Sequence, residues 1–279
     1  MMKVIGEFLD GLQHYGFLQS ALIASLLVGV MAGLVGCFII LRGMALMGDA
    51  ISHSVLPGVA LAHIFGINLL LGASLFGILA SLVIGFIAEK SKLKTDTSIG
   101  IVFSAFYALG FILIAQAEST ANLHHILFGN VLAVSGSDLR STVLVLAVVI
   151  LFIVLFYKEL LISSFDPIYA KTYGLNTRVL HYALMLLLTL VTVSALQTVG
   201  IILVVAMLIT PAATAFLWTN NLVKMLILAA TFGASAAFLG LFFSYTFNWA
   251  SGPAIVLVAA AIFLVTFWIA PKQGLLKFK

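Results

Sequence analysis

The chain has 279 residues, of which 63% are hydrophobic and only 8% are charged, and its mean hydropathy is +1.27. Soluble domains carry about 25% charged residues, so the composition excludes a soluble protein and predicts a membrane protein. The basic residues behind the net charge of +4 stand at the ends of apolar runs, which indicates membrane orientation rather than nucleic-acid binding. The single cysteine, Cys37, excludes a disulfide framework.

Apolar runs close to the ~20 residues that a helix needs to cross a bilayer recur along the chain. Residues 1–17 are interpreted as an amphipathic surface segment, and residues 18–279 as a single transmembrane domain. The predicted fold class is all-α, a polytopic membrane protein with eight or nine transmembrane helices. The expected segments are 18–41, 50–66, 68–88, 97–117, 139–157, 180–198, 200–217, 223–246 and 253–270.

The second and seventh segments contain Pro57 and Pro211, so either is a candidate for a broken or re-entrant helix. With nine spans and an external N-terminus, only Lys3 and Arg140 of the 13 Lys and Arg residues fall outside. The positive-inside rule favours this arrangement and predicts a cytoplasmic C-terminus. A re-entrant second segment would give eight spans and an internal N-terminus.

The polar segment 158–179 stands apart from the spans. Asp166 and Pro167 can begin a short helix as N-cap and first residue, and Gly174 can end it. Flanked by Lys171 and Arg178, such a helix is either a docking element for a partner or an ordinary capped loop.

The residues that indicate chemistry are Asp49 and His53, in "GDAISHSVLPG". Four residues apart, they share one helical face, and an ionisable residue inside a membrane segment by default marks a pathway or site. A carboxylate and an imidazole suit Mn²⁺, Fe²⁺ or Zn²⁺. Two ligands do not complete a shell, so a homodimer supplying two of each is one expectation. The alternative is that Asp49 caps its helix and His53 packs against a carbonyl.

Nearby residues are secondary candidates. Met44, Met47 and Ser52 are extra donors to consider, and His63 fits packing or the interface better than ligation. His124 and His125 lie between the fourth and fifth segments and are interpreted as interfacial.

Absent motifs narrow the function. The sequence holds no GxxxxGK[ST], so the chain has no ATPase site of its own, and it holds neither HExxH nor GxSxG. A proton-coupled secondary transporter, a permease for a metal chelate and a membrane metalloenzyme remain rivals. The polar loop argues against the first, the ligand pair against the second, and the lack of a third ligand or a general base against the third.

Four stretches carry a resemblance to a known family. "LRGMALMGDAISHSVLPGVALAH", "HHILFGNVLAVS", "SFDPIYAKTYGLN" and "VGIILVVAMLITPAATA" occur in an order that resembles the permease subunit of bacterial ABC importers for transition metals, and most of all its manganese branch. The resemblance implies a reduced type II importer fold in the bacterial cytoplasmic membrane. It also implies a homodimer, a cytoplasmic ABC ATPase and an extracellular metal-binding lipoprotein as partners.

The resemblance also implies roles for particular residues. Asp49 and His53 would bind the transported cation, with Mn²⁺ favoured over Zn²⁺ or Fe²⁺ and no permanently bound cofactor. Met47 and Leu56 are candidates for an apolar gate. The family's ATPase-coupling motif falls on Asp166, Pro167, Ala170, Lys171 and Gly174.

Overall fold

The computed structural model describes residues 2–116 and 131–270, in which every regular element is helical. Eight of these helices are long and apolar enough to cross a membrane, which confirms the all-α polytopic class. The elements are α1 (Met2–His14), α2 (Gly16–Leu41), α3 (Leu46–Ser54), α4 (Leu56–Phe65), α5 (Leu69–Lys90), α6 (Thr95–Gln116), η1 (Val131–Ala133), α8 (Gly136–Leu155), α9 (Tyr157–Phe165), α10 (Pro167–Thr172), α11 (Thr177–Val199), α12 (Ile201–Trp218), α13 (Leu222–Phe247) and α14 (Ser251–Ile269).

The two proline-containing segments behave differently. The second is a broken helix. Helix α3 ends at Ser54, Val55 separates the two halves, and α4 begins with Leu56 and Pro57. The seventh is the single helix α12, which carries Pro211 in its interior. A one-residue junction joins α11 to α12 at Gly200, whose φ of +82° is one that side chains rarely tolerate.

Contacts at the helix ends show how the α3–α4 pair passes through the described part of the molecule. Arg42, just after α2, donates hydrogen bonds to Ser163 and Ser164 of α9, and Arg178 of α11 forms an ion pair with Glu89 of α5. The C-terminal ends of α2 and α5 therefore lie at the same end of the molecule as α9 and α10. Since α5 is long enough to span, it starts at the opposite end, so the α3–α4 pair between α2 and α5 runs from one end of the described molecule to the other, as the nine-span arrangement expects.

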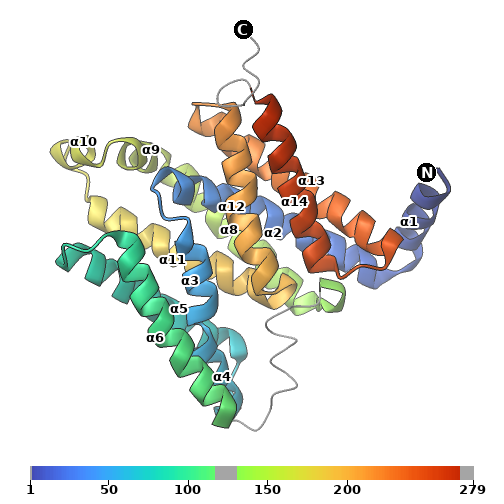
Figure 1. Cartoon of the computed structure of the whole chain (residues 1–279), viewed down its shortest axis with the longest axis horizontal. Coiled ribbons are helices and arrows are strands. Elements are labelled where there is room, and N and C mark those ends of the chain that lie inside the picture. The colour runs from blue at the N-terminus through green and yellow to red at the C-terminus, as the bar shows by residue number, and fades with distance from the viewer. Residues whose placement is uncertain (1, 117–130, 271–279) are drawn as a thin grey trace.

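The helices divide into central and peripheral ones. In α2 and α11, 67% of the apolar window is buried inside the protein, against 22% in α6 and 17% in α8. Figure 1 shows α2 crossing the middle of the molecule, and α12 and α13 pack along it. The apolar outer surfaces of α6 and α8 are suited to lipid or to another protein.

Helix α4 is fixed between its neighbours by backbone contact. Gly58 of α4 faces Gly72 of α5, and a Cβ built on Gly58 would clash with the carbonyl oxygen of Gly72. On the other side, a Cβ on Gly110 of α6 would lie 3.1 Å from Pro57. Small residues allow this approach, and they hold the helix after the break rigidly against α5 and α6.

Helix α1 lies outside the set of spanning helices. Its Phe8 is 1% exposed and makes edge contacts with Phe238, Phe242 and Tyr245 of α13. In Figure 1, α1 stands at the opposite end of the long axis from α10. The aromatic contacts attach the N-terminal segment to the bundle.

We predict that Gly58→Ala destabilises the protein whereas Gly100→Ala does not. The first substitution forces a methyl group into the backbone of α5, and overpacking of this kind costs about 1–3 kcal/mol. The second places the same methyl group on α6, where nothing lies within 4 Å. Thermal unfolding of the detergent-purified variants measures both, and equal midpoints would show that α4 and α5 are less tightly packed than described.

Candidate metal site

Asp49 and His53 lie one turn apart on α3. The chain leaves α2 at Arg42, turns through Gly43 with a φ of +66°, and resumes as helix at Leu46. Nε2 of His53 is 3.5 Å from Oδ1 of Asp49. The structure thus brings together the two side chains that the sequence indicates.

Helix α3 is buried on all sides but one. It packs against α5, α6, α11 and α12, and its residues that are not buried are Leu46, Asp49 and His53. Spaced three and four residues apart, these form a single open stripe. The Asp49 side chain is 45% exposed and that of His53 is 25% exposed. Since placing a carboxylate in hydrocarbon costs about 2.5–3.5 kcal/mol on insertion scales, this stripe must face water, a cation or protein.

Among the described residues, Asp49 makes no capping hydrogen bond and Nδ1 of His53 makes no hydrogen bond to a carbonyl. Helix α3 begins at Leu46, so Asp49 lies within the helix, and the N-cap residue is Ala45, which has no capping side chain. Nδ1 of His53 is buried and has no hydrogen-bond partner in the described part of the chain, so the ring is not held against a carbonyl. Within α3 the two side chains pair with each other, and Asp49 lies in the first turn of the helix.

Two aromatic rings of α6 contact the His53 imidazole. The centroid of Phe103 is 5.5 Å from that of the imidazole and the centroid of Tyr107 is 5.4 Å away, at interplanar angles of 69° and 89°. The two aromatic rings stack on each other at 5.8 Å. Sequence analysis missed both, because residues about fifty positions apart show no common pattern in a chain rich in aromatic residues.

The secondary candidates lie deeper in the protein than the pair. Met47 is 0% exposed, Leu56 2% and Met44 4%, and the buried Ser52 hydroxyl donates to the carbonyl of Gly48 at 2.8 Å. None of them belongs to the open stripe. Their roles as gate or extra donors stay predictions.

One chain supplies an incomplete ligand set. Within residues 2–116 and 131–270, no group of three or more His, Cys, Asp or Glu side chains could hold a metal ion. His63 is exposed on α4, and His124 and His125 lie outside the described residues. A metal ion held by Asp49 and His53 would therefore need further ligands from water, from backbone or from a second chain.

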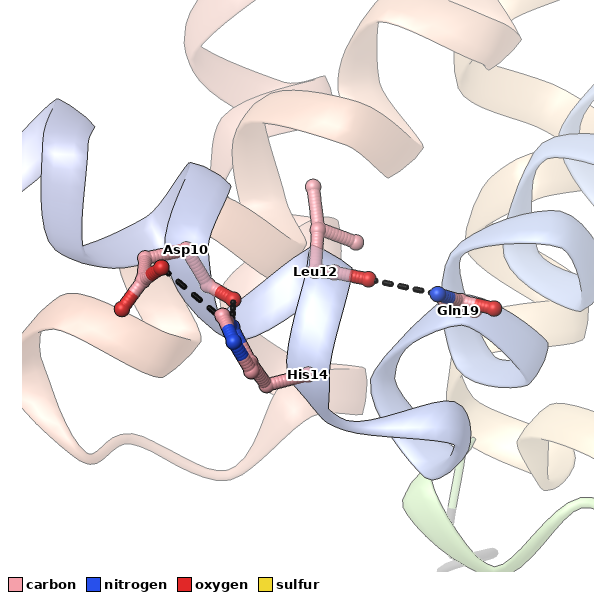
Figure 2. A network of polar contacts seen from close by, with 4 residues as sticks. All are labelled: Asp10, Leu12, His14 and Gln19. Atoms are coloured by element: carbon pink, nitrogen blue, oxygen red, sulfur yellow. Dashed lines mark hydrogen bonds and ion pairs between the residues drawn. The ribbon is translucent and has the colours of Figure 1, made fainter.

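A second pair with the same spacing, Asp10 and His14, lies on α1. Nδ1 of His14 is 3.2 Å from Oδ1 of Asp10 and 2.9 Å from its carbonyl oxygen, and both side chains are largely exposed, at 69% for His14 and 73% for Asp10. Figure 2 shows this pair beside a hydrogen bond from Gln19 to the carbonyl of Leu12. Matching chemistry outside the spanning helices makes this pair a natural control for the one on α3.

The short capped helix expected within 158–179 is present as α10. Oδ1 of Asp166 accepts hydrogen bonds from the backbone N–H groups of Ile168 (3.1 Å) and Tyr169 (2.9 Å), and Pro167 is the first helical residue. Gly174 follows the helix with a φ of +84°. These contacts satisfy both ends of a helix of only 6 residues.

Helix α10 has a buried side and an exposed side. Ala170 is 0% exposed, whereas Ile168, Tyr169 and Tyr173 are 78%, 54% and 67% exposed. Lys171 is exposed as well. Large apolar side chains on a helix that projects from the bundle indicate a docking surface, although the coupling role of these residues stays a prediction.

Glu89 of α5 pairs with Arg178, which lies at the start of α11 shortly after α10. The Tyr182 hydroxyl also lies 3.5 Å from the Glu89 carboxylate. The sequence indicated Arg178 as a flanking cation, and it gave no signal for its partner on α5.

The eight apolar helices of the described residues define a multi-pass membrane protein. The chain belongs to the ABC 3 transport family, whose model matches residues 14–270.

Individual proteins resemble the chain over almost its whole length. It is 65% identical to the manganese transport system membrane protein MntC of Listeria innocua, over 96% of both sequences. The structure of PsaBC from Streptococcus pneumoniae in complex with a Fab matches with a TM-score of 0.88 and 58% identity, over 96% of this chain and 97% of that one.

A more distant structure carries the same fold. An inward-facing conformation of a metal-chelate type ABC transporter matches with a TM-score of 0.72 at 20% identity, over 90% of this chain and 85% of that one. The importer permease fold that the sequence implied is confirmed.

We predict that Asp166→Ala unfolds α10 locally whereas Asp166→Asn does not. Alanine removes the oxygen that caps two backbone N–H groups, and loss of such a cap typically costs about 1 kcal/mol, or about fivefold in local opening. Asparagine retains an acceptor. Hydrogen–deuterium exchange of peptides covering 167–173 measures the effect, and equal exchange in the two variants would exclude a capping role for Asp166.

Proposed function

We propose that this chain is the transmembrane permease subunit of an ABC importer that carries Mn²⁺ into the cytoplasm. The observation that carries the proposal is the Asp49–His53 pair on the open stripe of α3, the first half of a broken membrane-crossing helix. Broken helices at mid-membrane are where transporters place ion sites. The relatives extend the proposal to the cation, because MntC of Listeria innocua is named as a manganese transport protein.

The ligand chemistry supports a divalent transition metal without selecting one. Carboxylate oxygen suits Mn²⁺, and imidazole nitrogen suits Fe²⁺ and Zn²⁺ as well. Manganese is favoured by the names of the relatives rather than by the pair itself, so the same importer type for Zn²⁺ or Fe²⁺ is the alternative. The metal is the cargo, and its site must bind weakly enough to release it.

A homodimer completes the proposed site. Asp49 and His53 supply two ligands, and the stripe that bears them is open on the single chain. A two-fold axis beside α3 would bring two aspartates and two histidines together and would cover both carboxylates. This arrangement accounts for a charged side chain that the chain alone leaves uncovered.

The two ends of the molecule indicate where two partner proteins would bind. The sequence holds no phosphate-binding GxxxxGK[ST] motif, so a separate ATPase would dock on the exposed side of α10. Arg42, Lys90, Lys171 and Arg178 stand at or near that end, which supports its placement in the cytoplasm. The four spans from α11 to α14 then return the C-terminus to that side. An extracellular metal-binding lipoprotein would deliver the cation at the opposite end.

We predict that Asp49→Ala and His53→Ala each lower ⁵⁴Mn uptake by cells expressing the whole importer. The loss should exceed about tenfold, since even residues that only support a metal ligand typically contribute that much to affinity. Both side chains are partly exposed, so truncation leaves no closed cavity. Competition by Zn²⁺ and Fe²⁺ in the same assay ranks the cations.

The matched controls are Asp10→Ala and His14→Ala, which remove the same residue types at the same spacing from α1. These variants should transport at the wild-type rate. Normal uptake by the α3 variants at normal membrane abundance would refute the proposed site.

We also predict that the detergent-solubilised chain, co-expressed with its ATPase, purifies as a complex with two copies of each subunit. Removing the apolar surface of α10 with Ile168→Asp and Tyr173→Asp should release the ATPase and leave the permease folded, because both side chains are more than half exposed. Native mass spectrometry counts the subunits. A monomeric permease in the intact complex would contradict the two-fold site.

A further inference from the structure

The His53 ring is held by an unusual set of contacts. A histidine that binds metal through one nitrogen almost always donates its other N–H to an acceptor that fixes the ring. Here Nε2 faces Asp49, and Nδ1 is buried without a hydrogen-bond partner in the part of the chain that the structure describes. The usual means of orienting the ring is therefore missing.

Contact with two aromatic rings orients the His53 ring in place of that hydrogen bond. Phe103 and Tyr107 stand one turn apart on α6 and stack on each other, so they form a continuous surface against which the imidazole lies. Both meet the imidazole at steep angles, at centroid distances of 5.5 and 5.4 Å. Edge-to-face geometry between rings is favourable in itself, and two rings meeting a third restrict its rotation.

We propose that Phe103 and Tyr107 are positioning residues of the metal site, which hold the His53 ring so that Nε2 stays beside Asp49. The inference rests on the proposed function, since it assigns support to the pair that would bind the cation. Neither residue is itself a ligand. Their contribution is to limit the rotation of a ring whose Nδ1 has no hydrogen-bond partner among the described residues.

The arrangement suits a site that must let its cargo go. When Nε2 binds a cation, the ring proton resides on Nδ1, and a buried N–H without an acceptor is unfavourable. An acceptor there would also raise the basicity of the ligand and strengthen binding. Aromatic support orients the ring without that strengthening, so the site can be well ordered and still weak.

The test measures Mn²⁺ binding to the purified importer. Electron paramagnetic resonance of free Mn²⁺ gives the affinity, and electron spin-echo modulation from ¹⁴N reports whether a histidine coordinates the bound ion. We expect nitrogen modulation in the wild type and an unchanged result in Tyr107→Phe, which keeps the ring. We expect about tenfold weaker binding and reduced nitrogen modulation in Phe103→Leu and Tyr107→Leu.

The control variant is Phe106→Leu. Phe106 lies on the same helix and pairs with Phe76 of α5 at 6.2 Å, away from the His53 contacts. It should bind Mn²⁺ as the wild type does. Tyr107 is 38% exposed, so Tyr107→Leu decides the question even if Phe103→Leu fails to assemble.

Each of the other outcomes would overturn a particular part of the proposal. Wild-type affinity and nitrogen modulation in Tyr107→Leu would refute positioning by the aromatic surface and leave the proposed site standing. Loss of binding in Tyr107→Phe would make the hydroxyl a ligand, and an equal defect in Phe106→Leu would mean a general loosening of α6. Absence of nitrogen modulation in the wild type would refute His53 as a ligand, and the proposed site would fall with this inference.

Discussion

A carboxylate inside a membrane has to meet water, a cation or another polar group, and the placement of Asp49 makes this the governing constraint on the structure. The charge lies on α3, a helix of 9 residues that α5, α6, α11 and α12 cover on every side but one. A break in a membrane helix also frees polar backbone groups, which lipid cannot satisfy. Here the break at Val55 is enclosed by protein, and the backbone contact of Gly58 with Gly72 fixes α4 against α5.

One helix, α11, contacts both the proposed docking surface on α10 and the candidate metal site on α3. Helix α11 starts at Thr177, after the short connection 173–176 that follows α10, and it contacts α9, α10 and α3. Arg178, in its first turn, pairs with Glu89 of α5, and α5 is in turn packed on α4. These contacts form a continuous path of touching helices from α10 to both halves of the broken helix.

Much of this arrangement could be predicted from the sequence, because its signals are local. Apolar run length located the spans to within a few residues, Asp166-Pro167 and Gly174 gave both ends of α10, and a separation of four put Asp49 beside His53. The faces of the helices could not be predicted, because a membrane helix that is apolar all round has no amphipathic pattern to show which side is buried. The burial of Met47 and the contacts of Phe103 needed the tertiary structure.

The exposed side of α10 has a consequence for how the protein is produced in the cell. Ile168, Tyr169 and Tyr173 form an apolar surface at the end of the molecule that we propose is cytoplasmic, and nothing covers them among the described residues. Uncovered apolar surface of this kind invites aggregation and exposes a chain to the chaperones and proteases that remove incomplete assemblies. We expect permease made in excess of the proposed ATPase partner to be short-lived, so that subunit balance is enforced by turnover as well as by synthesis.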